Sequence, residues 1–327
     1  MQAMLTAFIT MVMMLLYALP GFLFIKTGML KSDSIHSFSK LLVYICQPFL
    51  IIYTMTSVEY SPSLLAEMGI VFLLMLVLQF GMIALFAYLF RHRMQDARYR
   101  IYTVATCLGN YAFMGIPILR SLMPDSPNAL ACSAMCALSI NIVSWTAGCA
   151  VISGDRRYIS LRKILLNPAV IGLAVALPFF FLKVTPGGAI PRLLPELAAA
   201  KAIEPLLDEM IMLLARMSTP LCMIIMGMRL ALLPWRSVFC RPALYAVIAI
   251  KQLVLPLAVF GLLLLLPLST EFSRALLIMV ACPVAAVVQS FAELLGAGED
   301  TGAGIVLLGT SLSALTIPLV ALLLPLL

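Results

Sequence analysis

Charged residues are scarce in this 327-residue chain: Asp, Glu, Lys and Arg make up 11% of it, against about 25% in soluble globular proteins. Hydrophobic residues make up 63%, against the usual share of about 45–50%. So few charges cannot cover the surface of a soluble protein, and the composition excludes a soluble enzyme, a disordered chain and a nucleic-acid binder. At about 20 apolar residues per crossing, the chain is an integral membrane protein with room for roughly ten transmembrane helices.

Residues that catalyse reactions or bind metals are also rare in the apolar runs. The sequence has 2 histidines, and both lie in or beside predicted loops. Its 8 cysteines form no CxxC pair, so we expect buried thiols rather than a metal site or disulfides. The segment 296–300 (GAGED) resembles the GxGD motif of intramembrane aspartyl proteases, but no apolar run supplies the second aspartate. We therefore expect neither an enzyme nor a bound metal or cofactor.

The apolar runs predict an all-α fold of ten transmembrane helices. They cover residues 3–25, 38–56, 64–90, 101–120, 128–152, 166–183, 206–230, 240–267, 272–295 and 302–326. Between residues 183 and 210 the cluster of Pro186, Gly187, Gly188 and Pro191 predicts an interruption of helical structure before an acidic patch.

The basic residues predict how these helices are oriented. Of the 21 Lys and Arg residues, 14 lie in the odd-numbered connections or at the helix ends beside them, and 5 lie in or beside the even-numbered ones. Connections rich in Lys and Arg remain in the cytoplasm. We therefore expect a multi-pass protein of the cell (inner) membrane with both termini on the outer or periplasmic side, and contact with membrane lipids as a second role of the basic excess.

Two halves of the chain resemble each other. With a shift of 172 residues, segment 41–48 (LLVYICQP) aligns with 213–220 (LLARMSTP), and Ser139 aligns with Ser311. Five helices per half is an odd number, so the second half must enter the membrane inverted. We expect a first repeat over residues 1–152, a cytoplasmic connecting loop over 153–165 and an inverted second repeat over 166–327. Inverted repeats recur among secondary transporters.

The fourth and ninth runs are interrupted at corresponding places. Residues 109–117 (GNYAFMGIP) place two glycines, an asparagine and a proline inside the fourth run, and Cys282-Pro283 interrupts the ninth. Proline removes a backbone donor and disfavours helix before it. A simple packing kink explains single prolines elsewhere, but two interrupted helices in matching places indicate a transporter binding site. The helix N-termini created there favour an anion.

The motif Gly109-Asn110-x-x-Phe113-Met114-Gly115-Ile116-Pro117 resembles the GN-x-GF-x-GIP motif of the auxin efflux carrier (PIN-like) family. The resemblance implies two inverted five-helix halves whose broken fourth and ninth helices cross near the middle of the membrane. It also implies a scaffold of helices one, two, six and seven, and a mobile core of the other six. The implied substrates are organic acids, with Asn110 as a hydrogen-bond donor and Pro117 and Pro283 marking the crossing.

We therefore predict a secondary-active transporter of small organic anions, such as mono- or dicarboxylates, that works by elevator-like alternating access. The alternative is a channel or membrane sensor on the same fold. Coupling to H+ or Na+ and assembly as a homodimer are left open. Lys251 either balances the substrate charge or holds the ion-binding region of the core; the alternatives without a transport role are a structural ion pair and snorkelling. The candidate substrate-binding residues are Asn110, Tyr111, Gly115, Pro117, Pro283, Gln289, Asn141 and Gln47, and the candidate charge-coupling residues are Lys251, Glu293 and Arg216.

Overall fold

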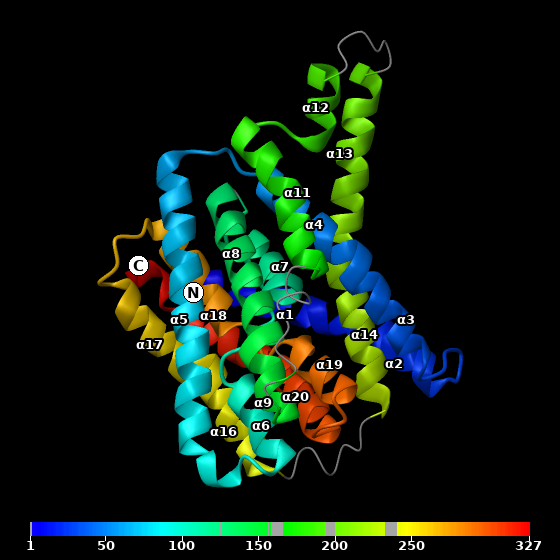
Figure 1. The fold of residues 1–327 in the computed structure, drawn as a ribbon, viewed down its shortest axis with the longest axis vertical. Coiled ribbons are helices and arrows are strands. Elements are labelled where there is room, and N and C mark those ends of the chain that lie inside the picture. The colour runs from blue at the N-terminus through cyan, green and yellow to red at the C-terminus, as the bar shows by residue number, and fades with distance from the viewer. Residues whose placement is uncertain (1, 125, 156, 158–165, 194–199, 233–240) are drawn as a thin grey trace.

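The computed structural model describes residues 2–124, 126–155, 157, 166–193, 200–232 and 241–327 (Figure 1). The described residues are almost entirely helical, and their β structure is limited to one isolated bridge between Gly109 and Val284. Seven helical stretches are long and apolar enough to cross a membrane, or eight if the bent pair at Pro168–Leu182 and Pro186–Arg192 is one span. The predicted connecting loop 153–165 lies largely outside the described residues.

The first half of the chain forms α1 (Gln2–Leu16), α2 (Ala18–Lys26), α3 (Ser34–Leu41), η1 (Leu42–Cys46), α4 (Gln47–Thr56), α5 (Pro62–Leu89), η2 (Arg91–Arg93), α6 (Ala97–Ala105), η3 (Tyr111–Gly115), α7 (Ile116–Leu122), α8 (Pro127–Val143), η4 (Ser144–Gly148) and α9 (Cys149–Ser153). The second half forms α11 (Pro168–Leu182), α12 (Pro186–Leu193), α13 (Ala200–Arg216), α14 (Ser218–Leu232), α16 (Pro242–Ala249), η6 (Ile250–Val254), α17 (Leu255–Leu263), α18 (Thr270–Ala281), α19 (Ala286–Leu294), α20 (Glu299–Ala321) and η7 (Leu324–Leu326).

Two of the expected spans are divided, as their glycines and prolines predict. In the fourth run, α6 ends at Ala105 and η3 begins at Tyr111. In the ninth run, α18 ends at Ala281 and α19 begins at Ala286. We call the two non-helical segments, residues 106–110 and 282–285, the first break and the second break. These divided helices account for part of the difference between the ten spans expected and the seven or eight continuous candidates.

The prediction for residues 183–210 is wrong in part. Helix α11 does end at Leu182, but Pro186–Leu193 folds into α12, bent 56° from α11. Proline at the first position of a helix has no N–H to leave unpaired, so Pro186 starts this helix rather than preventing it. The Gly187 N–H donates to the Asp208 carboxylate (2.8 Å), which attaches α12 to α13. In Figure 1, α12 and the first part of α13 extend beyond the other helices.

One group of helices packs through backbone contacts at glycines. A Cβ on Gly21 of α2 would overlap the carbonyl oxygen of Ile224 in α14, and a Cβ on Gly227 would overlap that of Ala18. Helix α11 approaches α4 in the same way, with Gly172 against the backbone of Pro48. Small residues allow membrane helices to approach this closely. Helices α2, α4, α11, α13 and α14 thus form one packed group.

The remaining long helices surround the two breaks. Helix α8 packs against α5 and α18, and α20 packs against α16 and α19. The second half of α18 is completely buried from Ala275 to Ala281, apart from 1% of Val280. The breaks therefore lie in the interior of the protein and not on its surface.

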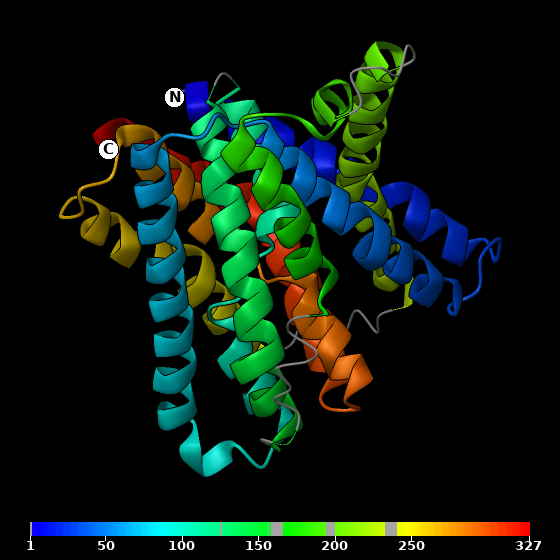
Figure 2. The same cartoon turned by 45° about the horizontal axis from the view of Figure 1, so that its top comes forward.

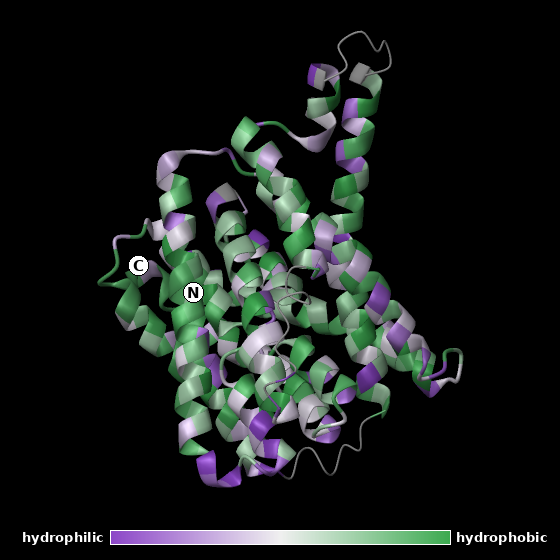
Figure 3. Cartoon of the chain, viewed as in Figure 1, coloured by the Kyte–Doolittle hydropathy of each residue, from purple (hydrophilic) through white to green (hydrophobic). Residues whose placement is uncertain are grey.

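The outer surface is apolar around the middle of the molecule. Large hydrophobic side chains such as Val77 (69% exposed) and Leu319 (53% exposed) point outward. Figure 3 shows hydrophobic residues over the middle of the molecule and hydrophilic residues gathered at its ends. In Figure 2 both chain termini lie toward the end opposite the turn that follows α5. This distribution matches an apolar belt in contact with lipid and polar ends in water.

Candidate functional site

The two breaks bind each other through their backbones. The Asn110 N–H donates to the Pro283 carbonyl (2.8 Å), and the Ala285 N–H donates to the Leu108 carbonyl (2.9 Å). These bonds flank the antiparallel bridge between Gly109 and Val284. Each break thus gives one hydrogen bond and accepts one. Non-helical backbone at membrane depth must find partners inside the protein, and this pairing supplies them.

Lys251 closes the end of the half-helix before the second break. It lies in the π-helical turn η6 and is 0% exposed. Its Nζ donates to the carbonyl oxygens of Val280 (2.6 Å) and Cys282 (3.0 Å). The last carbonyls of a helix lack intrahelical partners and carry a partial negative charge, which favours a cation. The partners that the structure gives Lys251 are therefore two backbone carbonyls rather than a carboxylate.

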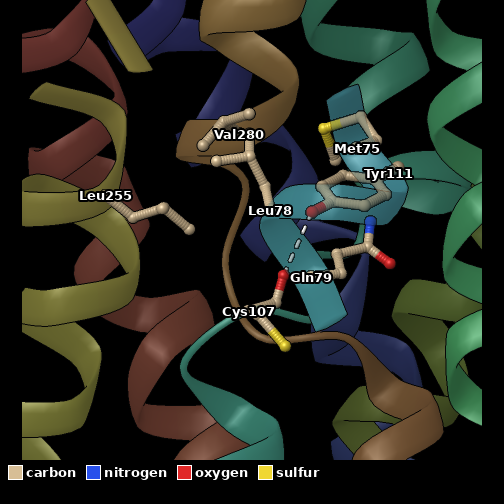
Figure 4. Close-up of a pocket in the computed structure, with 7 residues that line it drawn as sticks. All are labelled: Met75, Leu78, Gln79, Cys107, Tyr111, Leu255 and Val280. Carbon is tan, nitrogen blue, oxygen red and sulfur yellow. Dashed lines mark hydrogen bonds between the residues drawn. The ribbon is translucent and has the colours of Figure 1, made fainter. Parts of the chain in front are cut away.

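Tyr111 plays a similar part at the first break. It is 1% exposed, and its phenol donates to the Cys107 carbonyl (3.1 Å) just after α6 (Figure 4). Its ring also lies 5.8 Å from Lys251 Nζ, measured to the ring centroid. A Cβ on Gly109 would overlap this ring and approach Lys251 Nζ to 3.1 Å. Only glycine therefore fits at position 109, between the tyrosine and the lysine.

A small cavity borders this arrangement. Its volume is about 10 Å³, which is room for about one water molecule. Gln79 lies on its wall, and the Oε1 atom of Gln79 is buried with no hydrogen-bond donor. An organic anion does not fit this space, so it is no substrate pocket in this conformation. The cavity is lined by Met75, Leu78, Gln79, Cys107, Tyr111, Leu255 and Val280 (Figure 4).

Asn110 is the residue of the first break with an unused polar group. It is 3% exposed, and its Nδ2 is buried without an acceptor. Its side chain lies beside the Cys222 thiol of α14. A buried donor without a partner is costly, about 1–3 kcal/mol, and such groups are rare in folded proteins. The neighbouring thiol is only a weak acceptor, so the amide is available to a stronger acceptor where the first break faces the group of packed helices.

Pro283 and Gly115 also lie at or against the paired breaks, whereas Pro117 lies outside them. Pro283 supplies the carbonyl that Asn110 uses, and a Cβ on Gly115 would meet Met279 and Cys282. Pro117, by contrast, is the second residue of α7, which continues from η3. The helix Tyr111–Leu122 thus begins before Pro117 and runs through it, with the π-helical turn η3 directly before the proline. The chain breaks earlier, over residues 106–110.

Gln289 and Glu293 lie one helical turn apart on α19. Gln289 Nε2 donates to Glu293 Oε1 (2.9 Å), and the same oxygen forms an ion pair with Arg229 Nη1 (3.1 Å). Arg229 belongs to α14, so the pair joins α19 to the packed group. The predicted site residues Gln289 and Glu293 are thus connected to each other and to Arg229. The sequence analysis counted Arg229 among the cations of a loop and its helix ends.

The other three candidates lie in different surroundings. Asn141 Nδ2 donates to Ala137 (2.7 Å), and its Oδ1 accepts from Asn167 (3.2 Å), so its side chain already has partners. Gln47 is a buried residue at the start of α4, whose neighbours include α11 and α13. Arg216 is the exposed last residue of α13. None of these positions adds a donor to the breaks.

Two buried polar residues were missed in the sequence. Arg229 is 8% exposed, although it was counted among the cations of a connection. Gln252 is 0% exposed; its amide donates to Gly309 (2.7 Å) and accepts from Thr316 (2.7 Å), which attaches η6 to α20. Its place beside Lys251, in the middle of an apolar run, was the signal that could have identified it.

An apolar helical exterior and two interrupted helices that pair inside the protein are features of membrane transporters. Comparison with family models agrees: residues 6–161 and 156–321 each match the model described as membrane transport protein. The chain therefore belongs to this family, that of the auxin efflux (PIN-like) carriers, and it is a multi-pass membrane transport protein. No curated protein matches the chain.

Proposed function

We propose that this protein is a secondary-active transporter of small organic anions, such as mono- or dicarboxylates. The observation that carries the proposal is the buried, unpartnered Nδ2 of Asn110 in the first break. A carboxylate is acceptor-only when ionised, so it would satisfy this amide. The helix Tyr111–Leu122 begins at the next residue, and the partial positive charge of a helix N-terminus also favours an anion.

We further propose ten transmembrane helices in two inverted halves. Counting each divided helix as one span adds the fourth and ninth to the seven continuous candidates and the bent pair. The Ser218 hydroxyl donates to the Cys46 carbonyl (3.2 Å), and these residues align under the 172-residue shift. Equivalent residues of two halves related by a two-fold axis touch only near that axis. This contact therefore supports an inverted repeat.

The proposed mechanism is elevator-like alternating access. The closely packed helices α2, α4, α11, α13 and α14 would form the scaffold, and the helices around the breaks would move against it. Lys251 and the paired breaks keep the crossing intact during such a movement, because they join core segments to one another. Asn110 lies on the core side of the boundary, beside Cys222 of the scaffold.

The basic connections support an inner-membrane location with both termini on the outer side. Uptake measured with an imposed pH gradient and with an imposed sodium gradient distinguishes coupling to H+ from coupling to Na+. No carboxylate lies on the breaks themselves, so we place no coupling ion at a named residue.

The test is uptake of radiolabelled malonate and acetate into proteoliposomes, with and without a pH or sodium gradient. Saturable accumulation driven by a gradient is expected, and passive flux that never exceeds equilibrium would indicate the channel alternative. Asn110→Ala should abolish uptake. Asn141→Ala is the matched control, because Asn141 already has its partners within the protein. Normal uptake by Asn110→Ala would remove this residue from the site.

A further inference from the structure

Arg229 is a buried cation whose hydrogen-bonding capacity is only partly used. Its side chain is 9% exposed. Nη1 makes the 3.1 Å ion pair with Glu293, Nη2 reaches the Ser290 hydroxyl at 3.5 Å, and Nε is buried without an acceptor. A guanidinium can bind a carboxylate through two parallel hydrogen bonds. In this conformation the guanidinium makes one bond of ordinary length to a carboxylate and retains an unused donor.

Glu293 is a weakly held partner for this cation. Its side chain is 43% exposed, so the carboxylate keeps much of its hydration. The oxygen that meets Arg229 is shared with the Gln289 amide (2.9 Å). Exposed ion pairs contribute little to stability, because water screens the charges and holding the side chains together costs entropy. An incoming carboxylate could therefore replace Glu293 at small cost, whereas the buried Arg229 requires some anion at all times.

The position of Arg229 connects it to the proposed substrate site. On α14, Arg229 lies seven residues after Cys222, the neighbour of Asn110, and two helical turns span about 10.5 Å. On α19, Gln289 and Glu293 follow the second break by one and two turns. Seven residues are close to two full turns, so Cys222 and Arg229 lie on the same side of α14. Arg229 is therefore placed to act as a second station for the anion, next to that of Asn110.

We propose that Arg229 is a second anion-binding residue on the transport path, and that the Glu293 carboxylate occupies it until a substrate carboxylate displaces Glu293. The inference rests on the proposed function in naming the anion as a substrate. It assigns Glu293 the role of an internal competitor. A purely structural pair, which only ties α19 to α14, makes the opposite prediction, since removing Glu293 would then leave anion binding unchanged or weaker.

The experiment titrates malonate against the purified full-length protein and follows thermal unfolding, taking the half-saturating concentration for each variant. Glu293→Gln should lower that concentration and Arg229→Gln should raise it, each by about tenfold, the effect of about one charge-assisted hydrogen bond. In the double variant the gain from Glu293→Gln should disappear, because the cation is gone. The matched controls Glu299→Gln and Lys31→Gln alter exposed charges and should leave the concentration unchanged.

Unchanged or weaker malonate binding by Glu293→Gln would overturn the inference, as would an absence of malonate binding in both this variant and the wild type. If Glu293→Gln does not fold, Glu293→Asp replaces it, since the shorter side chain withdraws the carboxylate and should also strengthen binding. In a different outcome, uptake depends on Asn110 while substitutions of Arg229 and Glu293 leave malonate binding unchanged. That result would overturn this inference and leave the proposed function standing. Malonate binding that tracks both residues without any uptake would defeat the proposed function and leave this site standing.

Discussion

Lys251 Nζ lies 2.6 Å from the carbonyl oxygen of Val280, and this bond joins the eighth apolar run to the end of α18. A second bond from the same ammonium reaches the Cys282 carbonyl inside the second break (3.0 Å). The lysine thus substitutes for the backbone donors that the helix lost where it was interrupted. A central lysine costs about 2.5–3.5 kcal/mol on membrane-insertion scales, so a chain carries one there only where it has a function of this kind.

Replacing Lys251 by methionine should therefore destabilise the protein in spite of removing a buried charge. The carbonyl oxygens of Val280 and Cys282 would lose their donor, and each buried unsatisfied group costs about 1–3 kcal/mol. We expect a lower midpoint of thermal unfolding for the purified variant, together with loss of transport. Lys26→Met is the control, because Lys26 lies at the exposed end of α2. A Lys251→Met protein as stable as this control would contradict the assigned role.

The contact between α2 and α14 predicts that the stability of the protein depends strongly on the glycine at position 227. In Gly227→Ala the new methyl group would meet the Ala18 carbonyl, part of a backbone that cannot turn aside. Overpacking of this kind costs about 1–3 kcal/mol, which thermal unfolding would reveal. Gly81→Ala is the matched control, since nothing lies within 4 Å of its Cβ. Because alanine favours helix more than glycine does, that control should be neutral or slightly stabilising.

Two substitutions of Tyr111 should separate the contribution of its hydroxyl to stability from that of its ring. Tyr111→Phe removes the donor to the Cys107 carbonyl and should cost about 1 kcal/mol. Tyr111→Ala would empty a fully buried volume next to the existing cavity and beside Lys251, at about 3–5 kcal/mol. Thermal unfolding should therefore rank wild type above phenylalanine and phenylalanine well above alanine. Equal losses for both variants would mean that the ring contributes nothing.

The membrane class, the helical fold and the interruptions of the fourth and ninth runs could be predicted from the sequence. Hydropathy and the positions of glycine and proline report directly on each residue's own backbone and surroundings. The weak alignment of segment 41–48 with 213–220 also brought together Cys46 and Ser218, which the structure places in contact (3.2 Å). A pattern that local composition determines is therefore readable without any structure.

The pairing inside the site could not be predicted in this way. Whether Arg229 ends a span or lies buried depends on the position of α19, which is 64 residues away in sequence. The break itself was expected to include Pro117, but the helix Tyr111–Leu122 continues through this proline, with the π-helical turn η3 directly before it. The partners of Lys251 are backbone carbonyls, which no residue pattern marks.

Asn110 and Asn141 should respond to alanine in opposite ways. The Nδ2 of Asn110 has no partner in this conformation, so Asn110→Ala removes an unsatisfied donor and should leave the midpoint of thermal unfolding unchanged or higher. Asn141 bonds to Asn167 and Ala137, so Asn141→Ala should lower the midpoint by the loss of about 1–2 kcal/mol. Adding malonate reverses the contrast: the ligand-induced rise in midpoint should be smaller in Asn110→Ala, where Arg229 alone remains to bind the anion, and should persist in full in Asn141→Ala. An undiminished ligand-induced rise in Asn110→Ala would show that Asn110 does not bind the anion.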